Sequence, residues 1–125
     1  MSKRRIYLAL GVGIAASLLF TTSAAEEELD SLKVCADTQK LILENPFVRV
    51  IDDRIPVGVT EPKHRHARGL TIALTDYDIE QKTYPLGKVT RSHRAFGEVN
   101  WGEPVVHDVH NVGKTPSHAI RIELK

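Results

Sequence analysis

The sequence predicts an all-β fold: a single antiparallel β-barrel or jelly roll, preceded by a signal peptide. From Leu41 onward, short runs rich in Val and Ile alternate with Gly, Pro, Asn and Asp at near-regular spacing. No sustained 3.6-residue periodicity accompanies them, so the pattern favours a sandwich or barrel over helical architectures. The first 25 residues have a different composition and are treated as a separate segment.

Residues 1–25 have the order of a secretory signal peptide. Lys3, Arg4 and Arg5 precede an apolar run over residues 6–20, and small residues follow it, which indicates cleavage after Ala24 or Ala25. An uncleaved membrane anchor is the alternative, although 15 apolar residues are few for a membrane span. We therefore expect a periplasmic or secreted protein with no stable membrane association after cleavage.

Charge and cysteine content narrow the functional classes. Removal of residues 1–25 takes away three basic residues and no acidic ones, which leaves 14 Lys and Arg against 16 Asp and Glu. Without a basic patch, nucleic acid is not an expected partner. The mature length suits one domain. The single cysteine, Cys35, has no internal disulfide partner and is interpreted as incidental.

The chain after the signal peptide divides into an N-terminal lead, residues 26–39, and the barrel domain, residues 40–125. In the lead, Glu26–Leu32 could form a helical turn. One strand of the barrel is expected to carry His64 and His66. The other predicted strands are Leu41–Glu44, Phe47–Ile55, Gly69–Thr75, Ile79–Tyr84, Lys88–His93, Gly97–Trp101, Val105–Val112 and Ser117–Leu124.

Three histidines are candidate metal ligands. His64 and His66 are separated by one residue, so on a strand both rings lie on one face. His107 shares a face with Val105, Val109 and Asn111, whereas alternation places His110 on the opposite face. Two or three imidazoles on one side of a sheet are a ligand set typical of first-row transition metals.

The same residues resemble the two signature motifs of the cupin superfamily. Gly58, five intervening residues and the pair His64 and His66 match the first motif, and His107 with Asn111 matches the second. The chain departs from the pattern where motif one has a glutamate, because Leu70 and Thr71 occupy that position, and Gly102-Glu-Pro104 reverses the Pro-x-Gly of motif two. The resemblance implies a small single-domain β-barrel with a metal on His64, His66 and His107.

Three neutral imidazoles suit Fe, Zn, Mn, Ni or Cu, and the sequence does not choose among these divalent metals. Glu61 and Glu103, both in predicted turns, are the nearest acidic substitutes for the motif glutamate. No Ser-His-Asp order, phosphate-binding glycine loop or CxxC motif is present, so no catalytic residue is assigned. Two functional classes stay open: a non-catalytic ligand-binding or sensor module, and a metal-dependent oxidoreductase (dioxygenase-like) or isomerase.

The remaining expectations concern packing and partners. In the last strand, His118 alternates into one set with Ile120, Ile122 and Leu124, which we predict to face the core. His93 and His110 are interpreted as surface residues, and Trp101 as a core residue. A small-molecule ligand inside the barrel and a homodimer are the expected partners.

Overall fold

A computed structural model describes residues 23–125, so the predicted signal peptide lies almost entirely outside the described residues. Two short helices, α1 (Ala24–Glu28) and α2 (Ser31–Val34), precede the strands. The Asp30 carboxylate caps α2 by accepting a hydrogen bond from the Leu32 amide at 2.9 Å. Within residues 23–125, no helix is long and apolar enough to cross a membrane.

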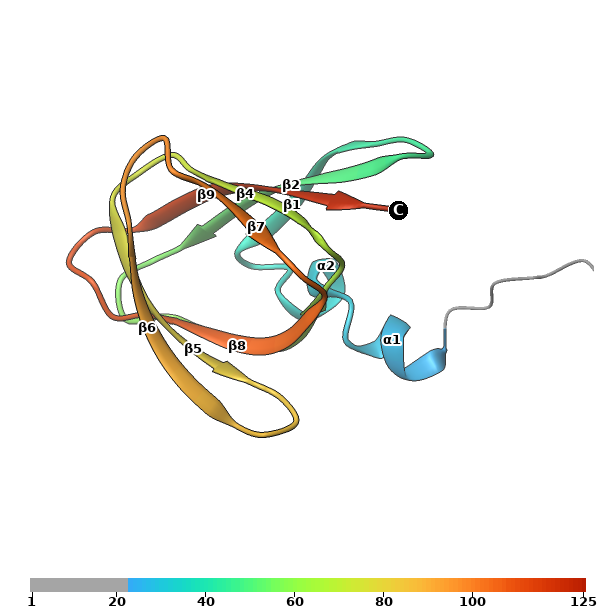
Figure 1. Ribbon diagram of the computed structural model, residues 1–125, viewed down its shortest axis with the longest axis horizontal. Helices are drawn as coiled ribbons and strands as arrows, with labels where there is room; N and C mark the ends of the chain where they lie inside the picture. Colours follow the sequence, from blue (N-terminus) through green and yellow to red (C-terminus); the bar gives the residue numbers. More distant parts are fainter. Residues whose placement is uncertain (1–22) are drawn as a thin grey trace, which may run out of the picture.

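The strands form two antiparallel sheets, which confirms the predicted all-β class (Figure 1). The five-stranded sheet has the order β1-β2-β9-β4-β7 and contains β1 (Gln39–Glu44), β2 (Val48–Ile55), β9 (Ser117–Leu124), β4 (Gly69–Ala73) and β7 (Val99–Gly102). The four-stranded sheet has the order β3-β8-β5-β6 and contains β3 (Thr60–His66), β8 (Val105–Asn111), β5 (Tyr77–Thr83) and β6 (Lys88–Arg94).

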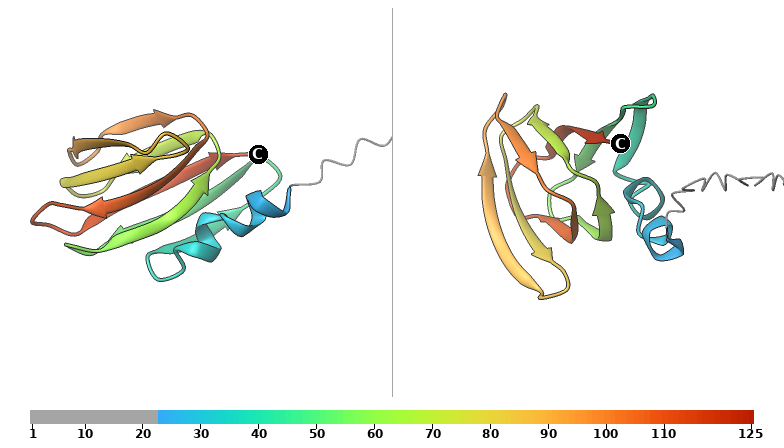
Figure 2. Two further views of the ribbon diagram at one scale, coloured as in Figure 1. Left: turned by 90° about the horizontal axis from the view of Figure 1, so that it is seen from below. Right: turned by 45° about the vertical axis from the view of Figure 1, so that its right-hand side comes forward.

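Turn residues set the entry to two of these strands. The Asn45 side chain accepts hydrogen bonds from the amides of Phe47 and Val48 and thereby closes the turn between β1 and β2. Gly58 has a φ of 76°, a conformation that other residues adopt rarely, and it leads the chain into β3. The β5–β6 hairpin extends beyond the rest of its sheet (Figure 2).

The lead is part of the folded domain. The Arg65 amide donates to the Leu29 carbonyl at 2.7 Å, and Ser31 is fully buried. Helix α2 lies beside β3 and β1 (Figures 1 and 2). The second half of the lead therefore lines one side of the domain, where Ser31, Cys35 and Gln39 are buried.

The interior between the two sheets has an apolar part and a polar part. One part is apolar, and its buried members are Ile55, Ala73, Tyr77, Ile79, Val109 and Ala119. The other part is polar, with buried histidine, carboxylate, amide and guanidinium groups. Buried polar groups are costly unless they are paired, so this concentration marks the part of the interior where a site is expected.

The predicted orientation of β9 is wrong. Ser117, Ala119, Arg121 and Glu123 are buried, whereas His118, Ile120 and Ile122 are half-buried and Leu124 is exposed. Alternation groups the residues correctly, but the charged group faces inward because its members find partners in the polar interior. Trp101, expected in the core, has 54% of its surface exposed.

Candidate metal centre

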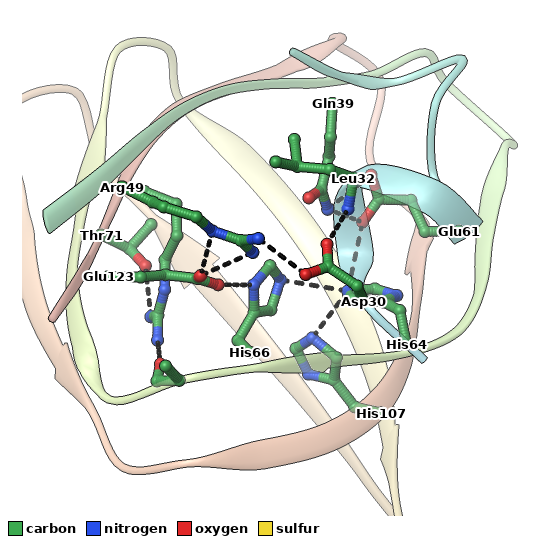
Figure 3. Close-up of polar contacts among 12 residues, drawn as sticks. Asp30, Leu32, Gln39, Arg49, Glu61, His64, His66, Thr71, His107 and Glu123 are labelled. Carbon is green, nitrogen blue, oxygen red and sulfur yellow. Dashed lines mark hydrogen bonds and ion pairs between the residues drawn. The ribbon is translucent and has the colours of Figure 1, made fainter. Parts of the chain in front are cut away.

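His64, His66 and His107 converge inside the domain, at the junction of β3 and β8 (Figure 3). The Nε2 atom of His64 lies 3.1 Å from Nε2 of His66 and 3.1 Å from Nε2 of His107. Antiparallel pairing sets His64 directly opposite His107, and a register shift between Glu61 and His64 precedes that pair. All three rings are buried.

Each of the three rings is oriented by a hydrogen bond at Nδ1. His64 Nδ1 donates to the Pro62 carbonyl at 2.7 Å, and His66 Nδ1 pairs with Glu123 Oε1 at 2.6 Å. His107 Nδ1 pairs with Gln81 Oε1 at 3.0 Å. Because these oxygens accept, the Nδ1 atoms carry the protons, and a neutral ring then presents the lone pair of Nε2. Such outer hydrogen bonds are typical of metal-ligating histidines.

The Nε2 separations fit a common cation. Two nitrogens bonded to one metal at about 2.0–2.1 Å lie about 2.8–3.4 Å apart for angles between about 90° and 109°. The observed 3.1 Å falls in this interval. Without a cation, three lone pairs would face one another at this distance, since neutral rings with Nδ1 protonated cannot donate between their Nε2 atoms.

Burial lowers the pKa of two of the rings, His64 and His107. Burial, then the neighbouring His64 and His66 and the Arg121 guanidinium, lowers the pKa of His107 to about 2. Burial, followed by His66, also lowers the pKa of His64. Protons therefore compete weakly for these two rings, which is a favourable property for metal ligands.

A chain of ionic contacts supports His66 from behind. Glu123 accepts from Arg49 Nη2 at 2.8 Å and Nε at 3.1 Å, and Arg49 Nη1 donates to Asp30 at 2.6 Å. Burial raises the pKa of Glu123, but the hydrogen bonds from His66 and Arg49 outweigh it and leave that pKa lowered. An ionised carboxylate behind His66 holds the ring in one tautomer and one orientation.

The position of the motif-one glutamate is filled differently. Leu70 faces away from the histidines, and the Thr71 hydroxyl accepts a hydrogen bond from Arg121 at 3.0 Å. The buried carboxylate nearest to the histidines is Glu61, whose Oε2 lies 3.7 Å from His64 Nε2. Glu61 was expected in a turn, but it lies in β3. Glu103 instead accepts from the indole of the exposed Trp101.

Cys35 is buried, and its thiol lies within reach of Glu61 and His64. Burial, then the carboxylates of Glu61 and Asp53, raises the pKa of the Cys35 thiol. A protonated thiol is a poor ligand and a poor nucleophile. The trio of histidines is therefore the stronger of the two ligand groups that share His64.

The polar interior contains two groups that the sequence analysis missed, Asp53 and Arg121. Both line a cavity of about 90 Å³ together with His66 and His107. Burial, then the Glu61 carboxylate, raises the pKa of Asp53 well above its usual range. The signal available in the sequence was the spacing of Arg121 and Glu123 with Ser117 and Ala119, which together form the face opposite the isoleucines.

The other histidines lie outside the centre. His110 pairs with the Thr60 hydroxyl on the opposite face of β8, and the exposed His93 pairs with Asp78. His118 pairs with Asp52 at 2.6 Å on the outer face of β9. The Asn111 amide, matched to motif two, donates to the carbonyls of Ile55 and Thr115, so it closes a turn and is not hydrogen-bonded to the histidines.

Solved structures with a similar fold include cupins. A cupin domain from Bordetella pertussis Tohama I has 27% identity and a TM-score of 0.63 over 70% of this chain and 91% of that one. A cupin-family protein with a double-stranded β-helix from Methanocaldococcus jannaschii has 11% identity and a TM-score of 0.57, over 69% and 77%. A cupin-superfamily protein from Desulfitobacterium hafniense DCB-2 has 10% identity and a TM-score of 0.52, over 69% and 74%.

No protein-family model matches the chain, and a search of curated proteins finds no match. The two-sheet arrangement nevertheless matches the double-stranded β-helix fold. The chain has the fold of small cupin-domain proteins, in agreement with the resemblance in its sequence motifs.

Proposed function

We propose that this protein is an exported cupin that holds one divalent transition metal on His64, His66 and His107 inside a jelly-roll barrel. The observation that carries the proposal is the convergence of three Nε2 atoms whose Nδ1 atoms are all engaged by oxygen acceptors. A metal bound there would act as a Lewis acid toward an oxygen-bearing ligand. The reaction, if the protein catalyses one, is unassigned.

The described residues support two roles for such a centre. A binding or sensor module needs the metal and the enclosed cavity. A metal-dependent oxidoreductase or isomerase also needs an acid or base beside the metal, and the buried carboxyl groups of Asp53 and Glu61 supply candidates that line the same cavity. We favour the metal-binding module over the enzyme, because metal binding requires only the three histidines.

Metal analysis tests the proposal directly. Protein purified without a histidine tag is loaded with Fe(II), Zn(II), Mn(II), Ni(II) or Cu(II), dialysed and analysed by mass spectrometry for bound metal. We expect one ion per chain in the wild type and none in a His64, His66 and His107 triple alanine variant. Undiminished binding by a folded triple variant would refute the metal centre.

We also propose export by the signal peptide of residues 1–25, supported by the basic, apolar and small-residue order of that segment. Intact-mass measurement of the protein from periplasmic and culture fractions should show a chain that begins after Ala24 or Ala25. A chain that retains Met1 in the membrane fraction would support the anchor instead.

A further inference from the structure

Arg121 is a charged side chain enclosed beside the histidines. It extends from β9 into the interior, keeps 8% of its surface exposed, and lines the same cavity as His66 and His107. A buried guanidinium is normally paired with a carboxylate through two parallel hydrogen bonds. Among the described residues, no carboxylate forms a hydrogen bond with Arg121.

The hydrogen bonds of Arg121 leave one edge of its guanidinium free. Nη1 donates to the Thr71 hydroxyl at 3.0 Å, and Nη2 donates to the Ala67 carbonyl at 2.5 Å. Nε is buried and has no partner. An unpaired buried donor costs free energy, so a ligand that accepts from Nε and the adjacent Nη would recover it.

Gly102 makes room for this arrangement. A Cβ atom at Gly102 would lie 2.9 Å from Arg121 Nη1 and would displace the guanidinium. Gly102 pairs with Gly69 across β4 and β7, next to the pair of Asn100 and Thr71. The absence of a side chain at Gly102 therefore leaves the space that the guanidinium occupies.

The location of Arg121 coincides with the departure from the motif. Where the pattern has an anionic glutamate, this chain has Thr71, and Thr71 binds the Arg121 guanidinium. A cation has thus replaced an anion next to the centre. Two enclosed cations repel each other unless an anion lies between them.

The cavity has space for a small ligand and a way in. The cavity of about 90 Å³ adjoins a second cavity of about 300 Å³, which is also lined by the exposed Trp101. The two share a wall that includes Thr71, Gln81, His107 and Arg121. A ligand of a few heavy atoms fits inside, and a longer one would extend into the second cavity.

We propose that the centre binds small organic monocarboxylates, and that the carboxylate bridges Arg121 and the metal in place of the missing motif glutamate. The ligand would accept from Nε and one Nη of Arg121 and present an oxygen to the ion. Arg121 is then the residue that determines specificity for a charged ligand over a neutral one. The inference rests on the proposed metal centre.

Glu61 is the competing anion, but its oxygens are already engaged. Oε1 accepts from the Thr38 hydroxyl, and the Gln39 amide lies 3.1 Å from both oxygens. These contacts hold Glu61 on the side of β1, whereas Arg121 is held on the side of β4. A carboxylate restrained in this way offsets charge without occupying the free edge of Arg121.

The test measures anion binding by protein whose metal content is already known. Wild type, Arg121→Met and Arg121→Lys are loaded with Co(II), and bound cobalt is quantified first. Each protein is then titrated with propionate, with uncharged propionamide and with inorganic phosphate, followed by the visible Co(II) spectrum and by calorimetry. The control variant Arg91→Gln changes an exposed arginine that lines neither cavity.

We expect propionate to bind the wild type and Arg91→Gln at least tenfold more tightly than propionamide. Arg121→Met should keep cobalt but bind propionate at least tenfold more weakly, because a charge-assisted pair is lost. Arg121→Lys should recover part of the affinity, since lysine keeps the positive charge but cannot form two parallel hydrogen bonds with a carboxylate.

Unchanged propionate binding by cobalt-loaded Arg121→Met would overturn the proposal, as would binding of phosphate without propionate. Failure of the wild type to bind cobalt would instead refute the metal centre, and propionate binding to the metal-free protein would then test Arg121 alone.

Discussion

The two faces of β9 differ in the polarity of their side chains. The inward face carries Ser117, Ala119, Arg121 and Glu123, and the outward face carries His118, Ile120, Ile122 and Leu124. The apolar set thus lies on the outside of the sheet, and the charged set lies inside. The two charged side chains on the inward face are hydrogen-bonded. Glu123 contacts His66 and Arg49, and Arg121 contacts Thr71. The interior of this strand serves the site, and the apolar packing surface is on the other side.

The largest difference between an inward and an outward face is expected when one histidine is removed from each. His66→Ala leaves two imidazoles at the centre and should remove most bound metal, since two neutral ligands hold a divalent ion weakly. His110→Ala removes a histidine on the outer face of β8, which contacts only the Thr60 hydroxyl among the described hydrogen bonds, and should leave metal content unchanged. Metal analysis after dialysis measures both, and equal loss from the two variants would contradict this assignment of the inner face.

A smaller effect is expected from the carboxylate behind the metal ligand. Glu123→Gln removes the charge that orients His66 and should weaken metal binding by about 10- to 100-fold. Arg49 also loses a partner, so thermal stability should fall. Titration against a chromophoric chelator measures the affinity. Glu103→Gln, which changes an exposed carboxylate at Trp101, is the control and should bind metal like the wild type.

The dependence of stability on pH tests whether the inner histidines are held neutral. His107 has a folded-state pKa of about 2, below the unfolded value of about 6.5, so the unfolded chain binds more protons between these values. The stabilisation is therefore present above about pH 6.5 and is lost as the pH falls toward about 2. Metal-free protein should lose about 1–2 kcal/mol of unfolding free energy between about pH 7 and about pH 5.

Urea denaturation at the two pH values measures this loss. His107→Gln should reduce the pH dependence, because the titrating group is gone. His93→Gln, which changes an exposed histidine, should preserve it. If all three proteins showed the same pH dependence, His107 would not be the source of it.

The sequence predicted which residues share a face of a strand better than it predicted which face points inward. Alternation correctly grouped His107 with Val109 and Asn111, and it correctly set His110 on the other face of β8. The same rule grouped the residues of β9 but could not determine which group faces inward, because that depends on partners distant in the chain. Arg121 is held by Thr71 and by Ala67, about 50 residues earlier. Hydrophobicity alone assigned the isoleucines to the core.

Glu61 illustrates a second limit. Its burial depends on Thr38 and Gln39 in the N-terminal lead, and neither has a motif that signals a contact. The Asp30 to Arg49 contact likewise joins the lead to β2. Side-chain networks between segments without sequence signatures were therefore missed, whereas the histidines were found because two of them lie in one strand and the third in a recognisable motif.

The outward face gives the last and smallest prediction. It continues across β4 and β7 with Leu70, Ile72, Val99 and Trp101, of which Val99 and Trp101 are more than half exposed. Contiguous exposed apolar residues are typical of protein–protein interaction sites. If the homodimer expected from the sequence forms through this face, Val99→Lys should shift the mass measured by light scattering from dimer to monomer. Metal content should not change, because Val99 points away from the histidines. Thr90→Lys adds the same charge to an exposed position on β6 and should leave the mass unchanged. A wild type that is monomeric at all concentrations would show that this face is not a contact between copies, and the apolar residues of β9 would then owe their position only to the partners that hold Arg121 and Glu123 inside.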